Sequence, residues 1–200
     1  MRASRKQAEE NRKRVIAASS ALFRERGFDG IGIVDLMKSA GLTQGGFYKQ
    51  FASKEDLSRV ACEQAHDENL VFWRDYLDGA TDDQKALAAF VRAYLSPTHR
   101  MQPDKGCMLA ALAPEARRRE QPVRAVFAKA IDDYAEMLCP LMPAANGAEQ
   151  RKAALALLAQ MVGALSLARA VPDPAVSDEI LDAAVQAITT GIAAQAPANS

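Results

Sequence analysis

One stretch of the chain combines side chains that suit nucleic acid with glycines that allow close approach. Gln44 is suited to a bidentate hydrogen bond with adenine, and Tyr48 and Lys49 are suited to phosphate oxygens. Between them stand Gly45 and Gly46, each of which costs about 1 kcal/mol relative to alanine inside a helix. A DNA groove that meets the backbone is one reason to keep this pair. The alternative is that the pair belongs to a turn and the helix begins late.

The elements around this stretch are predicted to form a helix-turn-helix motif. Two short helices, at about residues 33–40 and 44–51, flank a turn in which Gly41 supplies a positive φ, and Thr43 is expected to cap the second helix. Six apolar residues are spaced to bury the back of this pair against a first helix, residues 5–26: Leu36, Met37, Ala40, Leu42, Phe47 and Phe51.

The same motif defines the residues that should meet DNA. Lys54 joins them because it lies in the first turn of the following helix, where free N–H groups favour an anion. The residues expected to contact DNA are Thr43, Gln44, Gly45, Gly46, Tyr48, Lys49 and Lys54.

The charge distribution supports this expectation. The chain has 200 residues, 49% apolar and 25% charged, which is the balance of a globular protein with a real core. Its formal net charge is zero, but residues 1–60 contain 12 Lys and Arg against 7 Asp and Glu, whereas residues 61–200 contain 13 against 18. A basic end on an acidic body indicates that this end meets a polyanion.

The composition favours helices, and no segment shows a convincing two-residue alternation, so we predict an all-α fold of about nine helices. A three-helix domain is expected in residues 1–52, and a larger helical domain in residues 53–200. Ser53 and Asp56 fit a capping pattern at the start of the fourth helix. From there the expected helices are residues 53–78, 82–95, 106–118, 122–138, 148–170 and 174–194.

The last two helices are apolar on two adjacent faces. Such helices need partners on both faces; a second subunit is the simplest supplier of one, although burial within a single domain is the alternative. The residues expected at the interface of a homodimer are Leu155, Leu158, Val162, Leu165, Leu181, Val185, Ile188 and Ile192. A second row follows the last helix through Ile180, Ala184, Ala187 and Gly191.

Several classes of protein are not expected. The longest strongly apolar run, residues 153–168, is shorter than the ~20 residues that cross a bilayer, and the N-terminus has no apolar signal core. We therefore expect a cytoplasmic protein without a membrane partner. Three cysteines without a C-x-x-C pair, and only two histidines, favour a reducing compartment and argue against a metal site. No cofactor and no catalytic residue is expected.

Two segments resemble a known family. Gly27-Phe28-Asp29-Gly30 and the run IVDLMKSAGLTQGGFYKQFASKEDL at residues 33–57 are similar to the DNA-binding domain of the TetR family of bacterial transcriptional regulators. The resemblance covers about residues 10–60; residues 106–112 show a weaker likeness to one subset of the family. One departure is Ile31-Gly32-Ile33, which stands where many members have a Thr or Ser that caps the first helix of the motif, so the hydroxyl cap is missing or shifted.

The resemblance implies a function. It implies a homodimer that docks two such motifs in successive major grooves of a palindromic operator, most simply as a repressor. It also implies that the larger domain binds a small-molecule effector, which releases the DNA. The candidates for effector contacts are His66, Asn69, Trp73, Tyr94, Cys107 and Gln160.

Two further hypotheses concern the Cys107 thiol. At the start of a predicted helix its thiol could sense electrophiles or oxidants, although a buried, inert cysteine is the alternative. The rival function is a small all-α thiol enzyme that uses Cys107 with His66 or His99, but no base or orienting partner is visible in the sequence. A helical interaction module is the third possibility. A thiol enzyme would leave the basic N-terminal segment unexplained.

Overall fold

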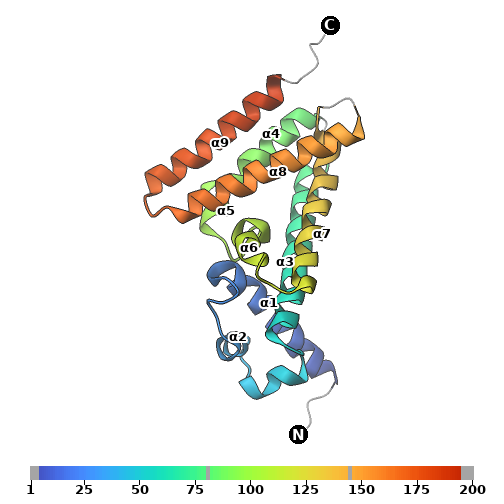
Figure 1. Cartoon of the computed structure of the whole chain (residues 1–200), viewed down its shortest axis with the longest axis vertical. Coiled ribbons are helices and arrows are strands. Elements are labelled where there is room, and N and C mark those ends of the chain that lie inside the picture. Colours follow the sequence, from blue (N-terminus) through green and yellow to red (C-terminus); the bar gives the residue numbers. More distant parts are fainter. Residues whose placement is uncertain (1–4, 80–81, 144–145, 195–200) are drawn as a thin grey trace. The chain divides into compact units, whose positions relative to one another are not determined.

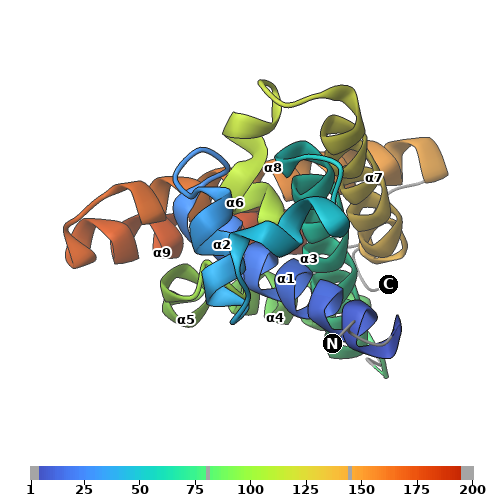
Figure 2. The same ribbon diagram turned by 90° about the horizontal axis from the view of Figure 1, so that it is seen from below.

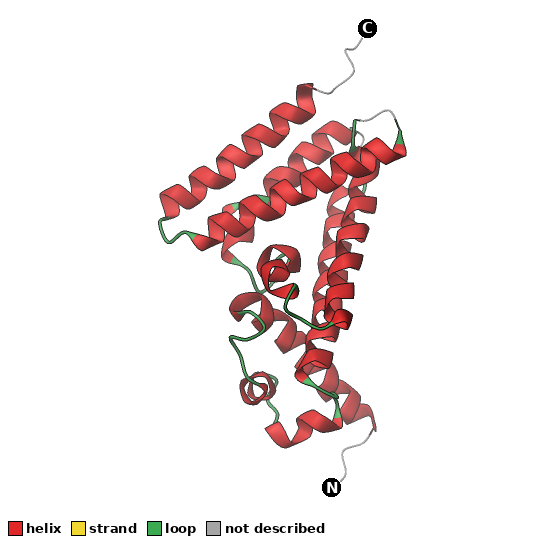
Figure 3. Cartoon of the chain, viewed as in Figure 1, coloured by secondary structure: helices red, strands yellow, loops and turns green. Residues whose placement is uncertain are grey.

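The computed structural model describes residues 5–79, 82–143 and 146–194, and in these ranges it contains α-helices and short 3-10 helices but no strand (Figures 1 and 3). The all-α prediction is therefore confirmed. The elements are α1 (Arg5–Arg26), α2 (Ile33–Ser39), the 3-10 helix η1 (Gln44–Lys49), α3 (Lys54–Leu77), α4 (Asp83–Tyr94), α5 (Pro97–Met101), α6 (Met108–Ala116), α7 (Gln121–Leu138), the 3-10 helix η2 (Cys139–Leu141), α8 (Gly147–Ala170) and α9 (Pro174–Ala194).

The helices form two compact units. One consists of the described residues up to Asn69 together with Pro103–Ala128, and the other of Leu70–Gln102 with the described residues from Lys129 onward. The first unit thus combines α1, α2 and η1 with α6, which lies far along the chain. The predicted domain boundary after residue 52 stays a prediction.

Local sequence signals explain most helix ends. Gly27 and Gly41 have φ values of 75° and 69°, which close α1 and make the turn after α2. At the start of α3, the Asp56 N–H donates to Ser53 Oγ (3.0 Å), and the Ala52 N–H donates to Asp56 Oδ2 (3.2 Å). The predicted capping pattern is confirmed.

The first unit buries the back of the helix-turn-helix. α1 packs on α2, and α2 packs on η1 (Figure 2). Five of the six predicted residues are buried: Leu36, Met37, Ala40, Phe47 and Phe51. Leu42 is only partly buried, because it lies in the turn rather than on the buried face of either helix.

In the second unit, α8 and α9 pack side by side (Figure 1). Of the eight predicted interface residues, four are buried within the chain itself: Leu158, Leu165, Leu181 and Ile188. The other four are partly buried. One apolar face of this helix pair is thus covered inside the chain. Among the described residues, α8 is also the one helix long and apolar enough to span a membrane by length and composition.

Two elements differ most from the prediction. The separate helix α5 was not predicted; Ser96 caps it by accepting from the His99 N–H (3.2 Å), and Arg169 of α8 donates to the His99 carbonyl oxygen (2.7 Å). α6 begins at Met108, two residues later than predicted, because Cys107 adopts an extended conformation and occupies the N-cap position.

Candidate nucleic-acid interface

The exposed face of η1 carries the predicted contact residues. Phe47 is fully buried, whereas the next residue, Tyr48, is 71% exposed, and their rings meet edge to face at 5.1 Å between centroids. Thr43, Gln44 and Lys49 are also exposed. The element therefore presents a polar and aromatic face to solvent while its apolar face is fixed in the core.

The contact element is a 3-10 helix rather than the predicted α-helix, and two details of the prediction are wrong. Thr43 occupies the N-cap position, but its side chain accepts no capping hydrogen bond. Gly46 is partly buried rather than exposed: a Cβ built there would lie 3.5 Å from Met37 Cε. A pair of adjacent glycines weakens α-helix formation, and the Gly46 N–H donates to the Thr43 carbonyl oxygen (3.1 Å).

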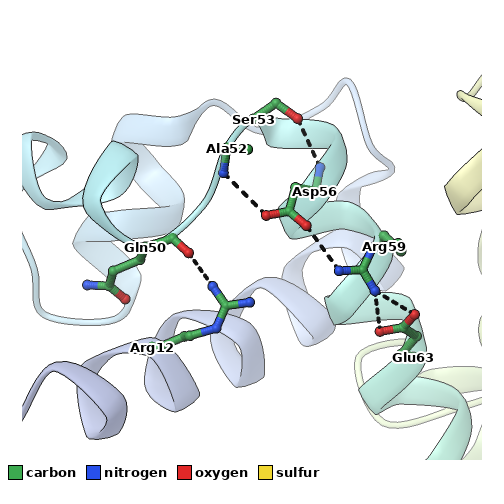
Figure 4. Close-up of polar contacts among 7 residues, drawn as sticks. All are labelled: Arg12, Gln50, Ala52, Ser53, Asp56, Arg59 and Glu63. Carbon is green, nitrogen blue, oxygen red and sulfur yellow. Dashed lines mark hydrogen bonds and ion pairs between the residues drawn. The ribbon is translucent and has the colours of Figure 1, made fainter. Parts of the chain in front are cut away.

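Two arginines of α1 bind the ends of the motif, and neither contact was predicted from the sequence. The Arg12 guanidinium donates to the carbonyl oxygen of Gln50, as Figure 4 shows. It also lies 4.4 Å from the centroid of the Phe51 ring. Arg14 donates to the Ala40 carbonyl oxygen (2.5 Å). Each cation thus satisfies a carbonyl at the C-terminal end of a short helix, where the helix dipole is negative.

Lys54 is partly buried, and its ammonium group already has a protein partner. Lys54 Nζ donates to the carbonyl oxygen of Phe28 at 2.5 Å, in the loop between α1 and α2. An ammonium group has three N–H donors, so this bond leaves two for other acceptors. The turn that carries Lys54 is stiffened by Arg59, which pairs with Asp56 (3.0 Å) and Glu63 (2.7 Å) (Figure 4).

Within the segment Ile31-Gly32-Ile33, the structure places Gly32 at the start of α2. It is the N-cap residue of α2, and α2 has no side-chain cap. No hydroxyl caps the first turn of α2, which therefore depends on its packing against α1.

The six effector candidates have different surroundings in the structure. Trp73 belongs to an aromatic cluster. The centroid of its ring lies 5.0 Å from that of Phe90 and 5.8 Å from that of Tyr94. Asn69 donates to the Lys105 carbonyl oxygen (3.5 Å). Gln160 is exposed and lines a cavity of about 220 Å³ among α4, α8 and α9. His66, on the same face of α3 as Asn69 and Trp73, is 2% exposed.

The cysteines lie mostly in the interior. Cys107 is fully buried and Cys62 is 2% exposed, whereas Cys139 is partly exposed. Burial raises the pKa of Cys62 to about 12, although the nearby positive charge of Arg24 opposes the shift. In the part of the chain that the structure describes, no group of three or more His, Cys, Asp or Glu side chains is placed to hold a metal ion.

The glycine pair yields a testable prediction. A Cβ at Gly45 meets no atom within 4 Å, so Gly45→Ala should raise the free energy of unfolding by up to about 1 kcal/mol. If DNA approaches this backbone, the same variant should bind DNA more weakly. Gly46→Ala is the matched control, because its methyl group points toward Met37 and should leave DNA binding unchanged. Urea unfolding and titration with duplex DNA measure both effects; equal DNA binding by the two variants would contradict a groove at Gly45.

Comparisons with known proteins agree with this arrangement. The family model described as bacterial regulatory proteins, tetR family, matches residues 15–60, and the tetracyclin repressor-like C-terminal domain matches residues 84–184. The chain is 22% identical over 129 residues to the HTH-type transcriptional regulator LmrA of Bacillus subtilis, which is 64% of this chain and 69% of LmrA. It is 33% identical over 94 residues to the HTH-type transcriptional activator FasR of Mycolicibacterium smegmatis, which is 46% of this chain and 42% of FasR.

A solved structure is similar over nearly the whole chain. It is a TetR transcriptional regulator from Chloroflexus aurantiacus, with 26% sequence identity and a TM-score of 0.78. The match covers 94% of this chain and 96% of that one. The similarity therefore extends through both units.

Proposed function

Because the chain belongs to the TetR family of bacterial regulatory proteins, we propose that it is a cytoplasmic transcriptional repressor that binds a palindromic operator as a homodimer and is released by an effector. The main support for this proposal is that one face of η1 is buried and the other is exposed to solvent. Its apolar face is fixed by Phe47, while the Tyr48 and Gln44 side chains project from a basic segment. A rigid support behind exposed hydrogen-bonding groups is what base reading in a major groove requires.

Dimerisation through α8 and α9 is supported by their uncovered faces. Ala159 of α8 and Ala183 of α9 are exposed, although they lie on largely apolar helices. Small side chains let helices of two subunits approach closely. The larger residues of the predicted row, such as Leu158, point into the chain instead, so we assign the contact to these alanines and to the partly buried residues beside them.

The effector is proposed to act in the C-terminal domain. Of the six candidates, Gln160 lines a cavity whose other side chains are largely apolar, which suits a small apolar molecule with one amide contact. An electrophile aimed at Cys107 would first have to open the structure, because that thiol is fully buried. The thiol-enzyme alternative needs the same access.

Two substitutions distinguish reading of bases from binding of phosphates. Gln44→Ala should relax the preference for operator over random DNA, because it removes a base contact. Lys54→Ala should weaken binding to both by similar factors and reduce the slope of log affinity against log salt by about 1. The operator for this experiment comes from a selection of bound genomic fragments, and binding is measured by titration over a range of salt concentrations.

Two outcomes would contradict the proposed function or the proposed roles of its residues. If the parent chain binds no DNA duplex at low salt, the proposed function is wrong. If the parent binds but both variants match it on every duplex, the roles of Gln44 and Lys54 are wrong. A rise in transcription of the operator-linked gene when this gene is deleted supports repression, and a fall supports activation, the activity named for FasR.

A further inference from the structure

Three charged side chains contact Phe28. It lies in the loop between α1 and α2 and is fully buried. Its N–H donates to Glu115 Oε2 (2.9 Å), its carbonyl oxygen accepts from Lys54 Nζ (2.5 Å), and the Arg119 guanidinium lies 5.3 Å from the centroid of its ring. Two of these three side chains come from α6 and the turn that follows it, about 90 residues away along the chain.

Arg119 also connects the loop to α3. Its Nη1 pairs with Asp29 Oδ1 (2.9 Å) and its Nη2 pairs with Glu55 Oε1 (2.7 Å). The Arg119 side chain is 18% exposed and that of Glu55 is 21% exposed, so this pair is better shielded from water than an ordinary surface ion pair. Glu55 is the immediate neighbour of Lys54. One guanidinium therefore fixes the loop and the first turn of α3 relative to each other.

We propose that Arg119 is a positioning residue for DNA binding, which acts by holding Phe28 and Glu55 so that Lys54 presents its ammonium group to a DNA phosphate. The proposal rests on the proposed function. The bond from Lys54 to the Phe28 carbonyl limits the rotamers of a long flexible side chain before DNA arrives. A group that is ordered in advance loses less conformational entropy when it binds. Without Arg119, the loop and α3 lose the guanidinium that bridges Asp29 and Glu55, so the bond from Lys54 to Phe28 is held less firmly and that advantage is reduced.

The matched pair for the test is Arg119→Gln and Arg118→Gln. Both remove one positive charge from the same turn, but the Arg118 side chain is exposed. The probe is a random-sequence DNA duplex at low salt, because a phosphate contact does not depend on sequence. We expect Arg119→Gln to weaken binding about tenfold, through the loss of charge-assisted hydrogen bonds, and Arg118→Gln to bind like the parent.

A double-mutant cycle with Lys54→Ala separates positioning from general stability. If Arg119 acts through Lys54, Arg119→Gln should weaken binding in the parent but have no further effect in the Lys54→Ala background. A merely structural residue would lower the melting temperature and leave the affinity of the folded protein unchanged. Arg119→Lys keeps the charge but cannot bridge both carboxylates from one planar group, so it should restore only part of the affinity.

A milder variant keeps the test valid if Arg119→Gln does not fold. Asp29 is 74% exposed, so Asp29→Asn should fold normally and weaken binding about threefold, again only when Lys54 is present. Two results would overturn this inference alone, provided that the parent protein binds the duplex. One is that Arg119→Gln and Arg118→Gln bind with equal affinity, and the other is that the effects of Arg119→Gln and Lys54→Ala on affinity are additive. Parent protein that does not bind would overturn the proposed function instead.

Discussion

Replacing Phe47 with alanine should lower the free energy of unfolding by about 3–5 kcal/mol and abolish DNA binding. The ring is fully buried, contacts the Phe51 ring at 5.5 Å between centroids, and supports the element that carries Gln44 and Lys49. Its removal leaves a cavity directly behind the proposed contact face. Urea unfolding of the full chain measures the first effect, and titration with duplex DNA measures the second.

Tyr48→Ala is the control for Phe47→Ala, because it removes the neighbouring aromatic ring, which is exposed rather than buried. Tyr48 is 71% exposed, so the variant loses only the edge-to-face contact with Phe47 and should unfold within about 1 kcal/mol of the parent. It should nevertheless bind DNA more weakly, because an exposed group proposed to contact phosphate is lost. The account of η1 would be wrong if Phe47→Ala were as stable as the parent, or if Tyr48→Ala left DNA binding untouched.

Stability should also fall steeply in mild acid, through His99. Burial lowers the pKa of His99 from 6.5 to about 4; the positive charge of Arg169 adds to the shift, and the hydrogen bond to the Tyr94 carbonyl oxygen opposes it. Between these two pH values the unfolded chain binds a proton that the folded chain does not. The contribution of His99 to the free energy of unfolding should therefore be constant above about pH 7. It should fall by roughly 3 kcal/mol as the pH drops to 4.

His99→Asn isolates this contribution from that of the carboxylates. The asparagine amide can still donate to the Tyr94 carbonyl oxygen, but it does not titrate. Urea unfolding of parent and variant at a series of pH values should give curves that converge as the pH falls, since the parent alone loses stability through His99. Parallel curves between pH 4 and 7 would show that His99 does not titrate as its burial indicates.

The sequence predicted those features that depend on local signals. Gly27 and Gly41 marked the end of α1 and the turn of the motif because their positive φ is a property of single residues. The start of α3 followed from Ser53 and Asp56, three residues apart. The exposure of Tyr48 beside a buried Phe47 followed from the spacing of apolar residues in one short element.

Features that depend on distant partners could not be predicted in this way. Glu115 and Arg119 contact Phe28 across about 90 residues, and no periodicity connects those segments. Similarly, spacing identified two apolar rows on α8 and α9 but could not say which row the chain covers itself; Leu158 and Leu181 proved to face inward. The 3-10 form of η1 was missed because the glycine pair weakens a helix without specifying its type.

Backbone amide hydrogen exchange of the full chain, with and without duplex DNA, tests most directly where DNA binds. We expect DNA to slow exchange in Gln44–Lys49 and in the first turn of α3, while amides in the middle of α8 exchange as before. Equal exchange of η1 in both states, with protection elsewhere, would contradict the assignment of this face to DNA.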